Sequence, residues 1–203
     1  MKKLKVSYLM KDKIVKTALK QFLKKGIRDI TIPKLMASLK ISSKTLYKHF
    51  ENKEQLLQEC VNLLYLNLFE DFRKVLSTDG DPVSKIKSVF TIALERDFGV
   101  SHKFYYDLNY YYPEVQNASI RLIAKESGEL LIPVVEQGIR DGYFLSDLDP
   151  YVSLRAINML YSSITRNKEE FEYKSEPRLL FKQTVIIQIR GMCTEKGLKY
   201  LDH

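Results

Sequence analysis

Residues 31–56, TIPKLMASLKISSKTLYKHFENKEQL, are the stretch that decides the fold. Thr31 is a favourable N-cap for a first short helix that ends near Leu39. A second helix is expected from Ser42 to about Phe50, and a third begins at Asn52. Two short helices with a tight connection, followed at once by a longer helix, predict a helix-turn-helix. In that motif the second helix enters the major groove of DNA.

The positive charge of the chain is concentrated around this stretch. The whole sequence carries a formal net charge of +8. Residues 1–55 hold 14 Lys and one Arg against four acidic residues, a net charge of +11, so the remaining residues carry −3. Binding to DNA phosphates requires such a positive field. A Lys-rich surface that only keeps the protein in solution is the alternative, but it would not explain why the charge coincides with a helix-turn-helix. We therefore expect double-stranded DNA as a partner.

Apolar residues recur at three- and four-residue spacing along the rest of the chain, which is the helical pattern. Residues 1–7 are expected to be a loose basic arm, and the stretch that holds Lys168, Glu169, Glu170 and Glu172 a charged linker. The sequence predicts an all-α protein of about nine helices with two domains. The first is a DNA-binding helix-turn-helix domain, a three-helix bundle, over residues 1–51. The second is a helical ligand-binding and dimerisation bundle over residues 52–203, and the helix that starts near residue 52 links the two.

The residue types do not indicate catalysis, a metal or a cofactor. The two Cys and three His residues fit no metal-ligand spacing, and neither a Gly-rich phosphate loop nor a nucleophile elbow is present. No apolar run approaches the roughly 20 residues of a membrane span. The N-terminus lacks the apolar core of a secretory signal. We expect a cytoplasmic protein that is not an enzyme and has no membrane partner.

A longer pattern in this region is specific to one family. It consists of Thr31-Ile32, Leu35-Met36-Ala37, Ile41-Ser42, Thr45-Leu46-Tyr47-Lys48-His49-Phe50, Asn52-Lys53-Glu54 and Leu56. This pattern resembles the DNA-binding domain of the TetR family of bacterial transcriptional regulators, over about residues 10–57. One departure is Lys40, at a turn position where the family usually has Gly. We expect Lys40 to take up a left-handed conformation or to alter the turn slightly.

The resemblance implies that Tyr47, His49 and Lys53 contact the phosphate backbone. Thr31 and Lys53 also lie at helix N-termini, which attract phosphate. Lys44, Thr45 and Lys48 are candidates for contacts to base edges, because Lys donates to guanine and the Thr methyl group touches thymine. Ser42 and Ser43 are candidates for phosphate or base contacts, although helix capping is an equally good explanation for one of them.

An aromatic segment over residues 104–112 suggests either a pocket or a core. At 100° per residue, one broad face of this segment holds Phe104, Tyr105, Leu108, Tyr111 and Tyr112. The first interpretation is a wall of a pocket for a small apolar effector, since such pockets are mostly apolar with a few hydroxyl groups. The second is ordinary core packing. A third hypothesis makes the segment a patch for a protein partner in place of a ligand.

The two last long helices are apolar on more than one side, as expected of a central helix or of a helix buried against a partner. We predict a two-fold homodimer through these helices, and the resemblance implies the same. Its predicted interface residues are Ala156, Leu160, Leu179, Val185, Ile186 and Ile189. The overall hypothesis is a repressor that binds a palindromic operator as a homodimer and is released by a small apolar effector.

Overall fold

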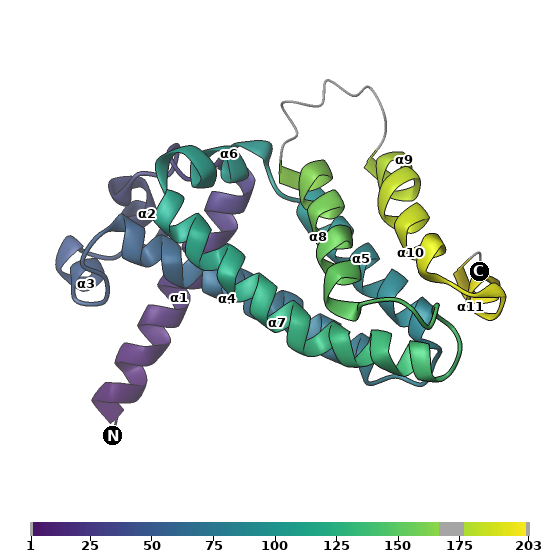
Figure 1. Ribbon diagram of the computed structural model, residues 1–203. Helices are drawn as coiled ribbons and strands as arrows, with labels where there is room; N and C mark the ends of the chain where they lie inside the picture. The colour runs from purple at the N-terminus through teal and green to yellow at the C-terminus, as the bar shows by residue number, and fades with distance from the viewer. Residues whose placement is uncertain (1, 167–176, 202–203) are drawn as a thin grey trace. The chain divides into compact units, whose positions relative to one another are not determined.

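The structure is a computed structural model that describes residues 2–166 and 177–201. It is all-α, as predicted, and the described residues form no strand; one isolated bridge joins Phe144 to Cys193. Figure 1 shows the elements in chain order. None of the described helices is both long and apolar enough to cross a bilayer. The expected charged linker lies outside the described residues.

The first four helices are α1 (Lys2–Lys25), α2 (Ile32–Leu39), α3 (Ser43–Tyr47) and α4 (Lys53–Leu76). They are followed by α5 (Pro82–Phe98), α6 (His102–Tyr111), α7 (Pro113–Arg140) and α8 (Pro150–Arg166). The last long helix contains α9 (Pro177–Phe181), the π-helical turn η1 (Lys182–Ile186) and α10 (Ile187–Met192). A short helix, α11 (Glu195–Leu201), ends the described chain.

Two of these elements differ from the expectation. Residues 2–7 are the first turns of α1 and not a loose arm; this stretch has no helix breaker and is rich in Lys and Leu, which favour helix. α11 was not predicted, because it is short and contains Gly197. This glycine is buried, and a Cβ atom there would lie 2.2 Å from the carbonyl oxygen of Tyr143, so only glycine fits.

The contacts divide the chain into two compact units. Unit 1 holds residues 1–67 and 100–122, and unit 2 holds residues 68–99 and 123–203. The sequence had placed a single boundary near residue 52 and the whole of 52–203 in the second domain. The difference arises because α6 packs with α1, a long-range association that local sequence patterns do not report, and the first turns of α7 fall in the same unit.

Unit 1 has its core where α1, α3, α4 and α6 meet. The largest fully buried side chains there are Phe22, Phe50, Phe104, Ile14, Ile27, Leu35, Leu46, Leu56 and Leu57. α6 is joined to α1 at its start, because the backbone N–H of Ser101 donates to the carbonyl oxygen of Leu23 at 2.8 Å. α1 ends at Lys25, and the φ of +89° at the following Gly26 suits glycine, the usual residue just after a helix.

Unit 2 is built around α5, which buries Val83, Ile86, Val89 and Phe90. α8 and the α9–α10 helix lie side by side in this unit (Figure 1). Polar contacts fix the ends of α5. The ammonium of Lys87 donates to the carbonyl oxygen of Leu201 at 2.7 Å, and the hydroxyl of Tyr161 donates to the carboxylate of Asp97 at 2.6 Å.

Candidate nucleic-acid interface

The turn between α2 and α3 is set by three local features. Thr31 is extended, with φ −77° and ψ 158°, and its hydroxyl accepts from the N–H of Lys34 at 3.4 Å. α2 ends at Lys40, whose φ of 55° and ψ of 46° are left-handed. The next N–H, that of Ile41, donates to the carbonyl oxygen of Met36 at 3.2 Å. The left-handed Lys40 therefore closes α2 as a glycine would, which is the first of the two expected outcomes.

α3 begins at an N-cap for which the sequence offers two candidates, Ser42 and Ser43. Ser42 is the cap, since its hydroxyl oxygen accepts from the N–H of Thr45 at 3.2 Å and lies 3.0 Å from the Thr45 hydroxyl. Ser43 is the first helical residue and is exposed. α3 ends at Tyr47, three residues before the expected end at Phe50. The chain continues in a tight turn, in which the N–H of Phe50 still donates to Leu46 at 3.1 Å.

The side chains of α3 and its following turn divide into a buried and an exposed face. Leu46 and Phe50 are 1% and 2% exposed, as expected for core residues. Tyr47 is 55% exposed, whereas Thr45 and His49 are half-buried. Ser43, Lys44 and Lys48 are exposed. The residues of α3 and its following turn that are predicted to contact DNA are therefore at least partly accessible.

His49 is held in its neutral form by its surroundings. Burial lowers the pKa of its imidazole below the usual value, and the charges of Lys48 and Lys11 lower it further. The His49 ring lies 6.3 Å from the ring of Phe50. A neutral imidazole keeps one N–H donor and one acceptor, so it suits a hydrogen bond to phosphate better than an ion pair with it.

The N-terminus of α4 carries the expected capping arrangement with one difference. The side-chain oxygen of Asn52 accepts from the N–H of Gln55 at 2.8 Å, and the Gln55 side chain accepts from the N–H of Glu51 at 2.7 Å. The reciprocal bond thus reaches one residue further back than in an ordinary capping box. Both bonds fix the entry of the chain from α3 into α4.

Lys53 is turned toward the protein. Its ammonium donates to the carbonyl oxygen of Ile27 at 2.6 Å and lies 5.8 Å from the ring centre of Phe22. Burial lowers its pKa, the carboxylate of Asp107 opposes this shift, and the Arg28 guanidinium adds to it. In this structure the Lys53 ammonium therefore secures the turn between α1 and α2.

The same turn is held from the other side by α6, through Tyr111 and through Asp107 and Lys103, which the sequence did not single out. Asp107 is only 7% exposed, and its carboxylate accepts from the backbone N–H of Arg28 at 2.8 Å. The Arg28 guanidinium stacks 4.0 Å from the ring centre of Tyr111. Lys103 forms an exposed ion pair with Asp29 at 3.3 Å. The only sequence signal for Asp107 was an acidic residue within an aromatic run.

The aromatic segment belongs to unit 1. Phe104, Tyr105 and Leu108 are at most 2% exposed and form part of its core, in line with the core-packing interpretation. Tyr111 is 47% exposed and stacks on Arg28, whereas Tyr112 is half-buried. Burial raises the pKa of the Tyr112 hydroxyl, and the carboxylates of Asp107 and Glu54 add to this effect. Three of the five expected pocket residues thus pack in the core of unit 1.

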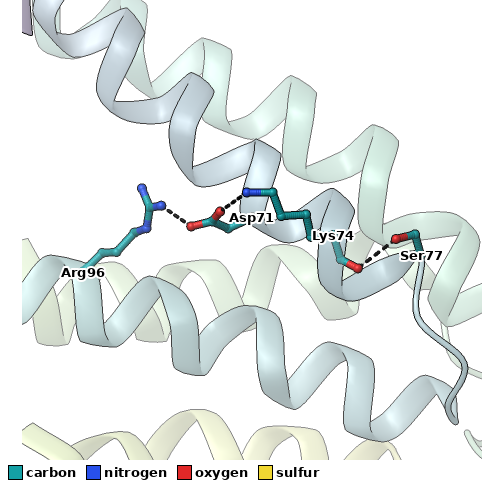
Figure 2. A network of polar contacts seen from close by, with 4 residues as sticks. All are labelled: Asp71, Lys74, Ser77 and Arg96. Atoms are coloured by element: carbon teal, nitrogen blue, oxygen red, sulfur yellow. Dashed lines mark hydrogen bonds and ion pairs between the residues drawn. The ribbon is translucent and has the colours of Figure 1, made fainter.

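Unit 2 contains a groove between α4 and α5 with a volume of about 480 Å³. Its lining residues are Asp71, Lys74, Val75, Ile92, Glu95 and Arg96. Figure 2 shows that the carboxylate of Asp71 accepts from both Arg96 and Lys74, the latter at 3.0 Å. These two cations hold the pKa of Asp71 below its usual value. The groove therefore offers charged groups beside two aliphatic side chains.

The predicted interface residues of the dimer fall into different environments. Val185 and Ile189 have 0% exposure within a single chain, so they were wrongly assigned to an interface. Leu179 is 49% exposed, and the remaining predicted residues, Ala156, Leu160 and Ile186, are half-buried. The α9–α10 helix is apolar on more than one side, so its sequence alone does not show which of these side chains pack within the chain.

The segment that contains α3 is similar to known DNA-binding proteins. Residues 14–60 match the family model described as bacterial regulatory proteins, tetR family. The transcriptional repressor KstR2 of Mycolicibacterium smegmatis is 25% identical over 146 residues, which cover 68% of this chain and 69% of that repressor. KstR2 of Rhodococcus jostii is 28% identical over 141 residues, 66% of this chain and 67% of the relative.

The fold is also similar to solved structures. A TetR-family transcriptional regulator from Cytophaga hutchinsonii matches with a TM-score of 0.75 at 14% identity, over 94% of this chain and 98% of that one. The likeness covers both units, and the family match covers the helix-turn-helix with its exposed α3 surface. The chain therefore carries a DNA-binding domain of the tetR family of bacterial regulatory proteins, which are transcriptional regulators and not enzymes, on a fold that matches such regulators along nearly its whole length.

Proposed function

We propose that this protein is a cytoplasmic repressor that binds a palindromic operator as a homodimer and releases it when a small effector binds. The observation that carries this proposal is the accessible surface of α3 within a segment of net charge +11. Repression is supported by the KstR2 relatives, which are described as transcriptional repressors. The remaining parts of the proposal rest on the geometry of the two units.

The proposed DNA contacts follow from exposure and hydrogen-bonding capacity. Tyr47 and neutral His49 donate to phosphate oxygens, and Lys44, Thr45 and Lys48 read base edges. Ser43 joins them, whereas Ser42 acts through its capping of α3. Thr31 and Lys53 contribute backbone N–H groups at helix starts. The Lys53 ammonium, which is bonded to Ile27, holds the turn in place.

The proposed dimer uses α8 and the α9–α10 helix, because large apolar side chains are exposed there. Val152 is 60% exposed, Met159 66% and Ile187 52%, together with Leu179. Burying such side chains against a second copy is favourable by roughly 25 cal/mol per Å² of apolar surface. Two-fold symmetry would place the two α3 helices in successive major grooves, about 34–36 Å apart.

The proposed effector site is the groove between α4 and α5. It lies along the second half of α4, the helix that begins directly after the α3 turn. Because its lining is largely charged, the groove favours an effector with a charged group attached to an apolar body. This differs from the small apolar effector that the sequence suggested. A negatively charged group of such an effector would compete with the Asp71 carboxylate for the side chains of Arg96 and Lys74. It can release DNA only if it prefers the DNA-free state.

Selection of binding sites from a random pool of duplexes tests the proposal. We expect an inverted repeat whose half-sites are about 10 base pairs apart, centre to centre. The variant Tyr47→Ala serves as a matched control that retains the buried Leu46 and Phe50. Enrichment of no sequence, with binding at low salt only, would contradict the operator. Enrichment of single half-sites would contradict the homodimer.

A second candidate is a regulator whose C-terminal part binds a protein instead of a small effector. It is favoured by three clustered tyrosines on the outer side of α6. Tyr110 is 70% exposed and its ring lies 4.6 Å from that of Tyr106, which lies 6.3 Å from that of Tyr111. Thermal-shift screening separates the two candidates. Stabilisation by small compounds that is lost in Arg96→Gln but kept in Tyr110→Ala supports the groove.

A further inference from the structure

The N-terminal turns of α1 extend beyond the core of unit 1. Of the side chains described from Ser7 onward, Ile14 is the first that is buried. Tyr8 and Leu9 are 72% and 57% exposed. Figure 1 shows this end of α1 projecting away from the other helices of unit 1. From Ser7 to Lys13 the helix therefore continues without a fully buried side chain.

This projecting segment is strongly basic. Residues 2–13 contain Lys2, Lys3, Lys5, Lys11 and Lys13 against a single acidic residue, Asp12. Two of these charges are already balanced within unit 1. Lys11 forms an ion pair with Glu59 at 2.7 Å, and Asp12 pairs with Lys16 at 2.9 Å. Lys2, Lys3 and Lys5 belong to the first turns of the helix.

Contacts at Lys11 locate the projecting segment next to the DNA-facing surface. The Lys11 ammonium lies 5.8 Å from the ring centre of Phe50, at the end of the turn that follows α3. Its charge is also one of those that lower the pKa of His49. The nine residues from Lys2 to Met10 reach about 13 Å further along the helix axis. They therefore start beside the proposed phosphate contacts and extend outward from them.

We propose that residues 2–13 form a basic arm that binds DNA phosphates flanking those reached by α3. This inference rests on the proposed DNA binding and extends it to a part of the chain outside the helix-turn-helix. The occupant is double-stranded DNA, because the arm adjoins the DNA-facing surface and carries the opposite charge to the phosphate backbone. The arm contributes affinity at any sequence, since phosphate contacts carry no base information.

The test compares two triple variants with the same loss of charge on the same helix. Lys2→Gln/Lys3→Gln/Lys5→Gln removes the arm's outer cations. Lys20→Gln/Lys24→Gln/Lys25→Gln removes three exposed cations roughly 30 Å further along α1. Binding to a fluorescent 30-base-pair duplex of mixed sequence is followed by anisotropy over a series of KCl concentrations. The variant with Arg at positions 2, 3 and 5 retains the charge and serves as the conservative control.

The arm variant is expected to bind more weakly and to lower the slope of log K against log[KCl] by up to about 2.7, or 0.9 per phosphate. The Arg variant should keep the wild-type slope, and the second triple variant should change it little. Equal losses in both triple variants, or no loss in the arm variant, would overturn the arm. Failure of the wild-type protein to bind any duplex would instead overturn the proposed function. Circular dichroism of each variant checks that the helical fold is kept.

Discussion

The carboxylate of Asp107 on α6 accepts a hydrogen bond from the backbone N–H of Arg28 at 2.8 Å, across 79 residues of sequence. This bond ties α6 to the turn from which α2 starts. The turn is also bonded to Lys53, so it is fixed on both sides by side chains from later helices. The placement of the helix-turn-helix therefore depends on residues outside the motif.

Asp107→Ala should lower the free energy of unfolding by about 1 kcal/mol, because the Arg28 N–H loses its acceptor. It should also weaken DNA binding, since the start of α2 is less well held. Asp107→Asn keeps an oxygen acceptor and should lose less of both. Urea unfolding and anisotropy measure the two effects. Asp147→Ala, an exposed loop substitution, is the control, and an equal loss there would contradict the prediction.

Tyr47→Ala and His49→Ala should each weaken binding to duplexes of any sequence, because both side chains are expected to contact phosphate and not bases. Tyr47→Phe removes the hydroxyl alone and should account for most of the effect at that position. Thermal melts by circular dichroism should stay close to wild type for the exposed Tyr47. A large loss of stability on its replacement would show that Tyr47 is a structural residue.

The Asp71–Arg96 pair should give unit 2 a stability that disappears in acid. Because its two cationic neighbours lower the folded-state pKa of Asp71, the pair stabilises the fold fully above the unfolded-state value of 3.8 and loses this effect as the pH falls through the lowered pKa. Asp71→Asn should therefore be less stable than wild type at pH 7 and nearly equal to it near pH 2. Denaturant midpoints at both pH values measure this difference. A constant difference would show that Asp71 contributes through packing and not through charge.

Met159→Glu and Ile187→Glu should dissociate the proposed dimer without unfolding the chain, because both side chains are more than half exposed in a single copy. Val185→Glu should instead unfold unit 2, since Val185 is completely buried. Light scattering after size-exclusion chromatography gives the mass of each variant. A folded dimer in both surface variants would place the interface elsewhere on the chain.

Local signals in the sequence predicted local structure well. The N-caps Thr31 and Ser42 and the left-handed Lys40 depend on neighbouring residues, and the structure has them where the sequence indicated. The buried positions of Leu46 and Phe50 follow from helical spacing in the same way. The exposed surface of α3 was thus accessible to sequence analysis before any tertiary contact was known.

Structural features that depend on long-range contacts could not be predicted from the sequence. The bond from Lys53 to Ile27 spans 26 residues, and no local pattern distinguishes an inward ammonium from an outward one. The same holds for Asp107 and for the assignment of α6 to unit 1. The inward side chains of Val185 and Ile189 were also missed, because this helix is apolar on more than one side and its pattern does not show which side faces α8.

The π-helical turn η1 lets the α9–α10 helix absorb a change in chain length. A π-turn accommodates one residue more than an α-helical turn. Deletion of a single residue within Lys182–Ile186 would therefore restore regular helix and leave α10 facing nearly the same way. Ile187 would stay exposed, and the face that this helix presents to another molecule would be kept. One codon lost at this turn would thus be tolerated, whereas the same loss inside a regular helix would rotate everything beyond it by about 100°.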